Sequence, residues 1–438
     1  MSFSRFSSSE SVATFALLAK NFRNRQWLVG NRYRDGCIER INSDCPDRTT
    51  NRIAKLSLKK YIAASAPLHC IDGWSFLGKA LLSCSLGDNN SAKHFAYYAE
   101  LRAAMSLLAS EGIGIFDKKH FTMDNLGLHG PITKEGGTHI AVKKAFEQWS
   151  QSTSSGALIE EIIRPAGVSL KDWFSVITSS AGSMSISRLA KDWLNLWGYD
   201  LTTLSVDQDI RNEASYRPTG LKSMLSMNAR FVSKFVIDMW TLLTPTINRS
   251  YYLDLLLLKK AVDDHFAPLP SGIARRGLSR VSIRQVIGSF SFSTTEATSL
   301  EKILLGSIRG INGNQLLKLA SSQTKDHDRY RYHFFMLARA ALLLRLATGA
   351  CARMAVEARI NKEDLKFWWM PLGVSFGFWK KEEQDPLFVM WKDVEQALNN
   401  VKDKVPDTMQ MEGWRTEYSE DILTLSGCER IGLSGICL

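Results

Sequence analysis

Apolar and polar residues follow a helical period over most of the chain. Ile53, Leu56, Tyr61 and Ile62 fall on one face of a helix whose other face carries lysines, which is the pattern of an amphipathic helix. Similar patterns predict helices at 74–85, 91–111, 139–150, 169–180, 185–197, 221–243, 250–265, 299–320, 327–348, 352–366, 385–404 and 415–425. The fold is therefore predicted to be mainly α.

Three stretches break the helical period. Residues 117–138 are rich in glycine, which indicates an irregular loop with a short strand. Residues 268–298 are rich in Gly, Ser and Arg, and the alternation at 281–286 fits a strand or a winged turn. Residues 367–384 combine Trp, Gly and Pro and indicate a loop. We place a domain boundary within 268–298.

These signals predict two helical bundles joined by a basic Gly/Ser/Arg-rich middle segment. The predicted units are an N-terminal helical bundle with a basic N-terminal region at 1–150, a helical middle region at 151–267, a basic linker or winged turn at 268–298, and a C-terminal helical bundle at 299–438.

The composition of the 438 residues is that of a globular protein. Apolar residues make up 45% and charged residues 23%, which excludes a disordered or fibrous chain. The seven cysteines form no CxxC pair, so we expect thiols in a reducing cytoplasm and no zinc site. The chain has no P-loop, GxGxxG, GxSxG or HExxH motif, and we expect neither a metal nor a cofactor.

Membrane and targeting segments are also not expected. The longest apolar stretch, Phe334–Ala350, is interrupted by Arg339 and Arg345, which argues against a membrane span. The apolar run Val12–Ala19 is short and follows Glu10, so no cleaved signal is expected.

Positive charge is concentrated near the N-terminus. The net charge is +11, and residues 1–60 hold twelve basic and five acidic side chains. Arg23, Arg25, Arg32 and Arg34 alternate with aromatic residues such as Trp27, a mixture that suits base stacking and phosphate contact on single-stranded nucleic acid. The alternative is that Trp27 packs into the core while the arginines face water.

A second basic cluster lies in the middle segment. Arg275, Arg276, Arg280 and Arg284 fall within ten residues, and no acidic residue lies between Pro268 and Phe290. Guanidinium groups bind phosphate oxygens in a bidentate manner, so these four arginines are our first choice for a nucleic-acid contact, either DNA or RNA. An exposed linker, or a contact with acidic residues of a partner protein, is the alternative.

The aromatic segment 367–379 is the third candidate. It contains Trp368, Trp369, Phe376, Phe378 and Trp379. Such an apolar segment either closes the core of the C-terminal bundle or binds a partner subunit, because Trp and Phe dominate interface hot spots.

The stretch His94–Ala109, preceded by the apolar helix Trp74–Ser85, resembles the central helix of HEPN-type helical bundles over about 60 residues. The resemblance implies a cytoplasmic bacterial protein of anti-phage defence or toxin–antitoxin systems that acts with nucleic acid, often RNA. The nuclease motif of that family has four to six residues between Arg and His. Only Arg329 and His333 come near it, with three residues between them.

The sequence therefore predicts a non-catalytic nucleic-acid-binding or assembly subunit of a defence-type system that also binds other protein subunits. Two alternatives stay open. One is a HEPN-like ribonuclease with a degenerate motif that uses Arg329 and His333. The other is a structural subunit that binds only proteins.

Overall fold

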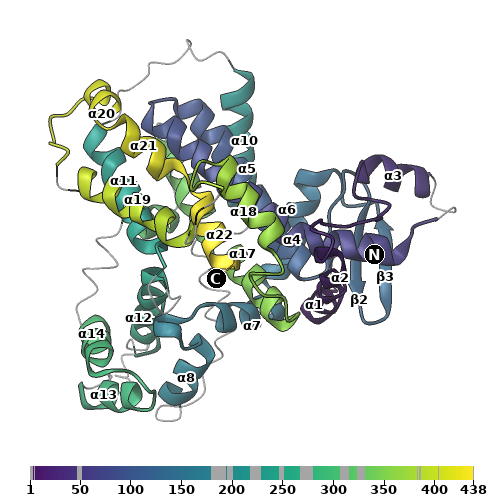
Figure 1. The fold of residues 1–438 in the computed structure, drawn as a ribbon, viewed down its shortest axis with the longest axis horizontal. Coiled ribbons are helices and arrows are strands. Elements are labelled where there is room, and N and C mark those ends of the chain that lie inside the picture. Colours follow the sequence, from purple (N-terminus) through teal and green to yellow (C-terminus); the bar gives the residue numbers. More distant parts are fainter. Residues whose placement is uncertain are drawn as a thin grey trace.

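The computed structural model shows a mainly helical chain with one small sheet, which confirms the predicted fold class (Figure 1). It describes residues 3, 5–46, 52–178, 194, 201–217, 228–245, 251–266, 280–305, 315–322, 331–381, 383, 386–402 and 404–437.

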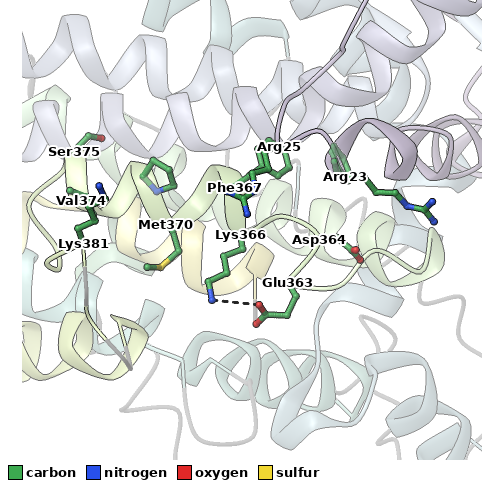
Figure 2. A pocket seen from close by; sticks show the side chains of 12 residues that line it. Arg23, Arg25, Glu363, Asp364, Lys366, Phe367, Met370, Val374, Ser375 and Lys381 are labelled. Carbon is green, nitrogen blue, oxygen red and sulfur yellow. Dashed lines mark ion pairs between the residues drawn. The ribbon is translucent and has the colours of Figure 1, made fainter.

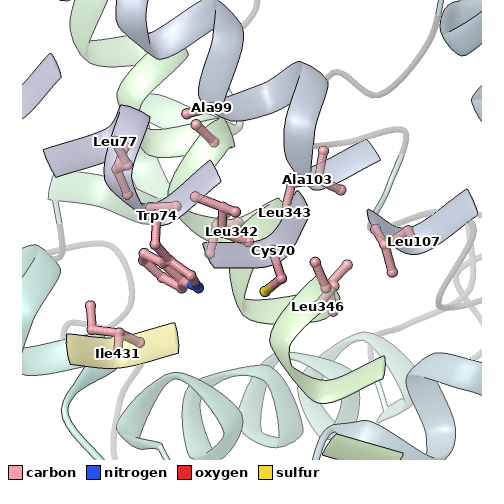
Figure 3. Packing of buried hydrophobic residues seen from close by; sticks show 14 of the residues in the cluster. Cys70, Trp74, Leu77, Ala99, Ala103, Leu107, Leu342, Leu343, Leu346 and Ile431 are labelled. Atoms are coloured by element: carbon pink, nitrogen blue, oxygen red, sulfur yellow. The ribbon is translucent and has the colours of Figure 1, made fainter. Parts of the chain in front are cut away.

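Three long helices form the centre of the fold. They are α4 (Lys55–Ser85), α5 (Asn89–Ser110) and α17 (Tyr332–Glu357), and each contacts the other two. Figure 3 shows side chains from all three in one hydrophobic cluster, to which α22 (Glu429–Cys437) adds Ile431. Helix α17, which belongs to the predicted C-terminal bundle, thus packs directly on helices of the predicted N-terminal bundle. The division of the chain into units stays a prediction.

Small residues on α4 allow this close packing. A Cβ atom on Gly73 would lie 2.6 Å from Leu344 Cδ2 of α17, so any larger residue would collide with the Leu344 side chain. The next residue of α4, Trp74, donates a hydrogen bond of 2.8 Å from its indole N–H to Thr348 Oγ1, which lies one turn after Leu344 on α17. Close helix approach and one buried polar contact therefore fix the position of α17 on α4.

Both arginines that interrupt the apolar run of α17 are buried and paired. Arg345 donates to the Asp254 carboxylate at 2.8 Å, and Arg339 donates to Asp207 at 2.6 Å and lies 3.5 Å from Glu100. By length and composition α17 could cross a membrane, but 94% of its most apolar window is buried inside the protein. It is the core helix of this fold.

The sheet and the first helices form one end of the molecule (Figure 1). Strands β1 (Ile113–Gly114), β2 (His120–Asp124) and β3 (Gly127–Ile132) pair antiparallel in the order β1-β2-β3, with Thr122 opposite both Ile113 and His129. The sequence predicts one short strand in 117–138, and the structure has two there. Beside the sheet lie α1 (Ser8–Ala16), α2 (Ala19–Phe22) and α3 (Cys37–Asp44).

The remaining elements surround the central helices. Between the sheet and α17 the chain forms α6 (Thr138–Ser150), α7 (Thr153–Ile162), a 3-10 turn (Pro165–Gly167), α8 (Leu170–Thr178), α10 (Leu201–Tyr216), α11 (Ala229–Leu243), α12 (Tyr252–Phe266), α13 (Arg280–Gly288), α14 (Thr294–Leu305) and α16 (Gln315–Ala320). After α17 come α18 (Lys366–Ser375), α19 (Pro386–Val401), α20 (Met411–Glu417), α21 (Ser419–Ser426) and α22.

Two predictions of non-helical structure are wrong. The alternation at 281–286 belongs to helix α13, where Ile283, Val286 and Ile287 are buried at helical spacing, so the strand or winged turn is corrected to a helix. Residues 366–375 form α18 even though Pro371 lies inside it, so the first half of the predicted loop 367–384 is helical. The remainder of the predicted linker, 268–279, and most of the predicted helix 185–197 lie outside the described residues.

Candidate functional site

The basic N-terminal segment forms a tight turn after α2. Arg25 has a φ of 55° and Leu28 a φ of 54°, both in the left-handed region that disfavours residues with a side chain. The Arg25 N–H closes the turn with a hydrogen bond of 2.8 Å to the Phe22 carbonyl. The side chains of Arg23 and Arg25 are exposed, whereas the ring of Trp27 lies 5.0 Å from that of Phe22. Trp27 thus packs into the core, in agreement with the alternative prediction.

The aromatic segment is held mainly by contacts within the chain. The indole N–H of Trp369 donates to the Lys362 carbonyl at 2.9 Å, and that of Trp379 donates to the Met370 carbonyl at 3.2 Å. The ring of Phe378 faces the Arg430 guanidinium at 4.0 Å. Trp368, Trp369, Phe378 and Trp379 are all buried, which corrects their assignment to a partner interface in favour of core closure. Phe376 is half-buried, and its role stays a prediction.

The N-terminal turn and α18 meet although they are about 340 positions apart in the sequence. The rings of Phe22 and Phe367 are 5.4 Å apart, and those of Trp27 and Trp368 are 5.3 Å apart. Next to these contacts lies a groove of about 760 Å³, which we call the α2–α18 groove (Figure 2). Its lining residues are Phe22, Arg23, Arg25, Glu363, Asp364, Lys366, Phe367, Met370, Pro371, Val374, Ser375 and Lys381.

The α2–α18 groove combines an apolar surface with a cationic rim. The apolar part is supplied chiefly by α18, where Val374 is 39% exposed. Four cations and two carboxylates border it, and Lys366 Nζ lies 3.7 Å from Glu363 Oε2, as the dashed line in Figure 2 marks. Within the described part of the chain, Arg23 and Arg25 form no ion pair. The rim therefore carries a net positive charge that is open to an anionic ligand.

The other predicted cations do not join this groove. Arg32 pairs with the buried Asp44, which also accepts a hydrogen bond of 2.7 Å from the Tyr33 hydroxyl. The Arg32 guanidinium lowers the pKa of Asp44, so Arg32 acts in holding the N-terminal segment. Arg34 pairs with Asp35 on the surface at 3.2 Å.

The arginine cluster of the middle segment is described only in part. Arg284 is exposed on α13 and pairs with Glu301 at 2.9 Å, so part of its charge is already compensated. Arg275 and Arg276 lie outside the described residues. Arg280 begins α13, but its side chain is also outside them.

The catalytic alternative is not supported by the position of its histidine. His333 lies on α17 with 0% exposure, and both of its ring nitrogens lack a hydrogen-bond partner among the residues that the structure describes. Burial lowers the pKa of His333 to about 3, so the ring is neutral. Arg329 lies outside the described residues. An imidazole in this position reaches no substrate, which corrects the proposed role of His333.

Comparison with known proteins adds no relative. No family model, no curated protein and no solved structure matches this chain. The assignment of a site therefore rests on geometry. Sequence reasoning identified Arg23 and Arg25 but missed Lys366, Met370 and Lys381, since no local pattern signals that α18 lies beside the N-terminal turn.

Proposed function

We propose that this protein binds single-stranded nucleic acid in the α2–α18 groove and does not catalyse a reaction on it. The supporting observation is the combination of four cationic side chains with an apolar surface in one groove. A single strand presents phosphates and unpaired bases together, so it can use both features, whereas a duplex presents mainly phosphates.

The volume of the groove agrees with a ligand of limited size. Ligand sites in proteins range from about 300 to about 1,000 Å³, and the α2–α18 groove, at about 760 Å³, falls within that range. We propose that a short stretch of an extended strand lies along α18. Its bases contact Phe367, Met370 and Val374, and its phosphates pair with Arg23 and Arg25.

The backbone at Arg25 supports a functional role for this side chain. A residue other than glycine in the left-handed region costs about 1–2 kcal/mol, and such strain concentrates at functional sites. Arg25 is exposed and forms no ion pair in the described part of the chain, so packing does not explain its presence. Binding of a phosphate by the Arg25 guanidinium explains it.

A binding titration tests this proposal. Fluorescence anisotropy of the full chain is measured with labelled single-stranded DNA, single-stranded RNA and the matching duplex. The double variant Arg23→Glu/Arg25→Glu is expected to bind single strands at least tenfold more weakly. Its plot of log K against log salt should become less steep. The magnitude of the slope should decrease by about 1.4, because each phosphate that is no longer neutralised removes about 0.7 from it.

A charge-matched control separates the groove from the general basic surface. Lys302 on α14 and Lys402 after α19 are exposed and lie away from α2 (Figure 1). The variant Lys302→Glu/Lys402→Glu changes the net charge by the same amount and is expected to bind nearly as the unmodified protein does. Equal weakening by both double variants, or tighter binding of the duplex than of the single strands, would overturn the proposal.

The broader expectations about this protein remain predictions. Association with other protein subunits, a cytoplasmic location and a role in bacterial defence derive from the sequence and its resemblance to HEPN-type bundles. If neither nucleic acid binds, the purely protein-binding subunit becomes the better hypothesis, and co-purification from the native host would test it.

A further inference from the structure

A second group of polar residues lies on α5, α6 and α10, three helices that contact one another in pairs. Its centre is the ring of Tyr98. His94 lies on one side of that ring at 5.0 Å and His139 on another at 6.3 Å, both measured between ring centroids. The Arg211 guanidinium lies over the same ring at 5.5 Å and over Tyr97 at 5.0 Å.

Arg211 is only 6% exposed and has no acidic partner among the residues that the structure describes. Its Nε atom has no hydrogen-bond partner, and none of the described carboxylates forms an ion pair with it. Two of the acids on α10 are engaged elsewhere, since Asp207 pairs with Arg339 at 2.6 Å and Glu213 pairs with Arg217 at 3.7 Å, and the third, Asp209, is exposed. A buried guanidinium without a counter-charge is strongly unfavourable, and the aromatic faces offset only part of this cost.

The side chains around Arg211 are donors that reach the surface. His94 Nδ1 lies 2.8 Å from the exposed Ser215 hydroxyl, and His139 Nδ1 lies 2.8 Å from the Tyr97 hydroxyl. Lys143, one turn after His139 on α6, is half-buried and donates to Gln208 at 2.5 Å. His94 and His139 thus lie beside the guanidinium, Lys143 follows His139 on α6, and no described carboxylate pairs with Arg211.

We propose that Arg211, His94, His139, Tyr98, Lys143 and Ser215 form a binding site for a phosphate group, which we call the Arg211 site. The phosphate supplies the counter-charge that Arg211 lacks, and its oxygens accept hydrogen bonds from the guanidinium fork, the imidazoles and the hydroxyl. The site is independent of the α2–α18 groove, since the two share no residue.

The electrostatics of the free site agree with this inference. Burial and the positive charge of Arg211 both lower the pKa of His94 and of His139, and Lys143 lowers that of His139 further. Burial also lowers the pKa of Lys143, although Asp209 and Asp207 act in the opposite direction. A phosphate dianion placed among these groups reverses the effect of Arg211 and favours protonation of both imidazoles.

Histidine nuclear magnetic resonance tests the Arg211 site. The side-chain nitrogens of the full chain are labelled, and the titration of His94 and His139, assigned with the His94→Asn and His139→Asn variants, is followed with and without inorganic phosphate at constant ionic strength. Phosphate is expected to raise the pKa of both histidines, while the signals of His129 on β3 do not respond. Unchanged titration of His94 and His139 would overturn the proposal.

Two variants, one at a buried and one at a half-buried position, are compared so that misfolding of one of them does not decide the result. Arg211→Gln is expected to raise both histidine pKa values without phosphate and to abolish the phosphate response. Lys143→Gln, at a half-buried position, is expected to weaken phosphate binding about threefold. A phosphate response that persists unchanged in both variants would place the anion elsewhere and reject the site.

The source of the phosphate is distinguished by a second titration. A single-stranded oligonucleotide with a terminal phosphate and its unphosphorylated counterpart are compared in the unmodified protein and in Arg211→Gln. If inorganic phosphate displaces the phosphorylated strand but not the unphosphorylated one, the terminal phosphate of the strand is the ligand. A response to inorganic phosphate but to neither strand would identify free phosphate. In the groove variant Arg23→Glu/Arg25→Glu, the titration of His94 and His139 is expected to respond to inorganic phosphate as it does in the unmodified protein.

Discussion

The indole rings of Trp27 and Trp368 meet edge to face, with centroids 5.3 Å apart and planes inclined by 85°. Trp27 belongs to the basic N-terminal turn and Trp368 to α18, so this contact, like that of Phe22 with Phe367, joins the two segments that border the α2–α18 groove. Edge-to-face geometry is favourable because the positive edge of one ring faces the negative face of the other.

This contact predicts a measurable coupling between the two residues. In a double-mutant cycle with Trp27→Leu and Trp368→Leu, the two changes should couple by about 0.5–1.5 kcal/mol in the free energy of unfolding. Urea unfolding of the four proteins provides the measurement. Strict additivity of the two single changes would contradict the observed contact.

Replacing Arg25 separates backbone strain from charge. Arg25→Gly and Arg25→Ala both remove the guanidinium, so both should weaken single-strand binding to the same degree. Since φ at this position is 55°, the glycine variant should be about 1 kcal/mol more stable than the alanine variant. Thermal unfolding and anisotropy are measured on the same samples, and equal stability of the two variants would mean that the turn is not strained.

The buried pair of Arg345 and Asp254 should contribute strongly to stability. Asp254 accepts hydrogen bonds from Arg345 at 2.8 Å and from the Arg164 backbone N–H at 3.0 Å. Asp254→Ala leaves a buried guanidinium without its partner and should cost about 3–5 kcal/mol. Asp209→Ala, which removes an exposed carboxylate on α10, is the matched control and should change stability by less than about 0.5 kcal/mol. Chemical denaturation distinguishes the two.

His333 should destabilise the protein in acid. Burial lowers its pKa to about 3, below the value of about 6.5 in the unfolded chain, so the unfolded state binds one more proton between these values. Stability is therefore lost as the pH falls from about 6.5 towards 3, by up to about 1.4 kcal/mol per pH unit for this group.

The variant His333→Leu tests this linkage. It removes two buried nitrogens that lack partners among the described residues, and should stabilise the protein by about 1 kcal/mol at neutral pH. Its unfolding free energy should also decrease less steeply in acid. His69, whose pKa burial likewise lowers to about 3, still contributes its own slope, so the pH dependence should be reduced and not abolished. An acid limb as steep as that of the unmodified protein would contradict the prediction.

Glu100 should act in the opposite direction. Its carboxyl is 1% exposed, and burial together with the nearby Asp207 raises its pKa well above the ordinary value, while Arg339 counteracts this. The titratable groups around it are Asp207, Arg339, Tyr332 and Tyr97. The folded state thus binds more protons than the unfolded state above about pH 4.3, and stability falls as the pH rises from there.

Glu100→Gln removes this titration while keeping the size of the side chain. The melting temperature of the variant relative to the unmodified protein is expected to increase between about pH 5 and about pH 8, because glutamine has no cost of ionisation. Calorimetry at the two pH values measures the difference. A constant difference, or one that shrinks as the pH rises, would show that folding does not raise the pKa of Glu100.

Much of the secondary structure could be predicted from local patterns, and most of the polar sites could not. The helical periods in 74–85 and 91–111 correctly predict that these residues are helical, since one-sided burial leaves a period in the sequence. The amphipathic pattern at Leu56–Ile62 and the pattern at 74–85, predicted as separate helices, belong to the one continuous helix α4. The local pattern does not predict α18, a helix that continues through Pro371. The indole N–H groups of Trp369 and Trp379 donate to the carbonyls of Lys362 and Met370, and these hydrogen bonds hold the helix in place. Tertiary contacts there override the local signal.

The sequence by itself determined the mainly helical class, the excess of cations near the N-terminus and the presence of many large aromatic side chains, because composition and local spacing encode these directly. Only the tertiary structure decided which cations act together. It pairs Arg32 and Arg284 with carboxylates, brings Arg23 and Arg25 to α18, and leaves Arg211 buried beside two histidines. The physical reason is that charges interact through space over a few ångströms, and folding brings together residues that the chain separates by hundreds of positions.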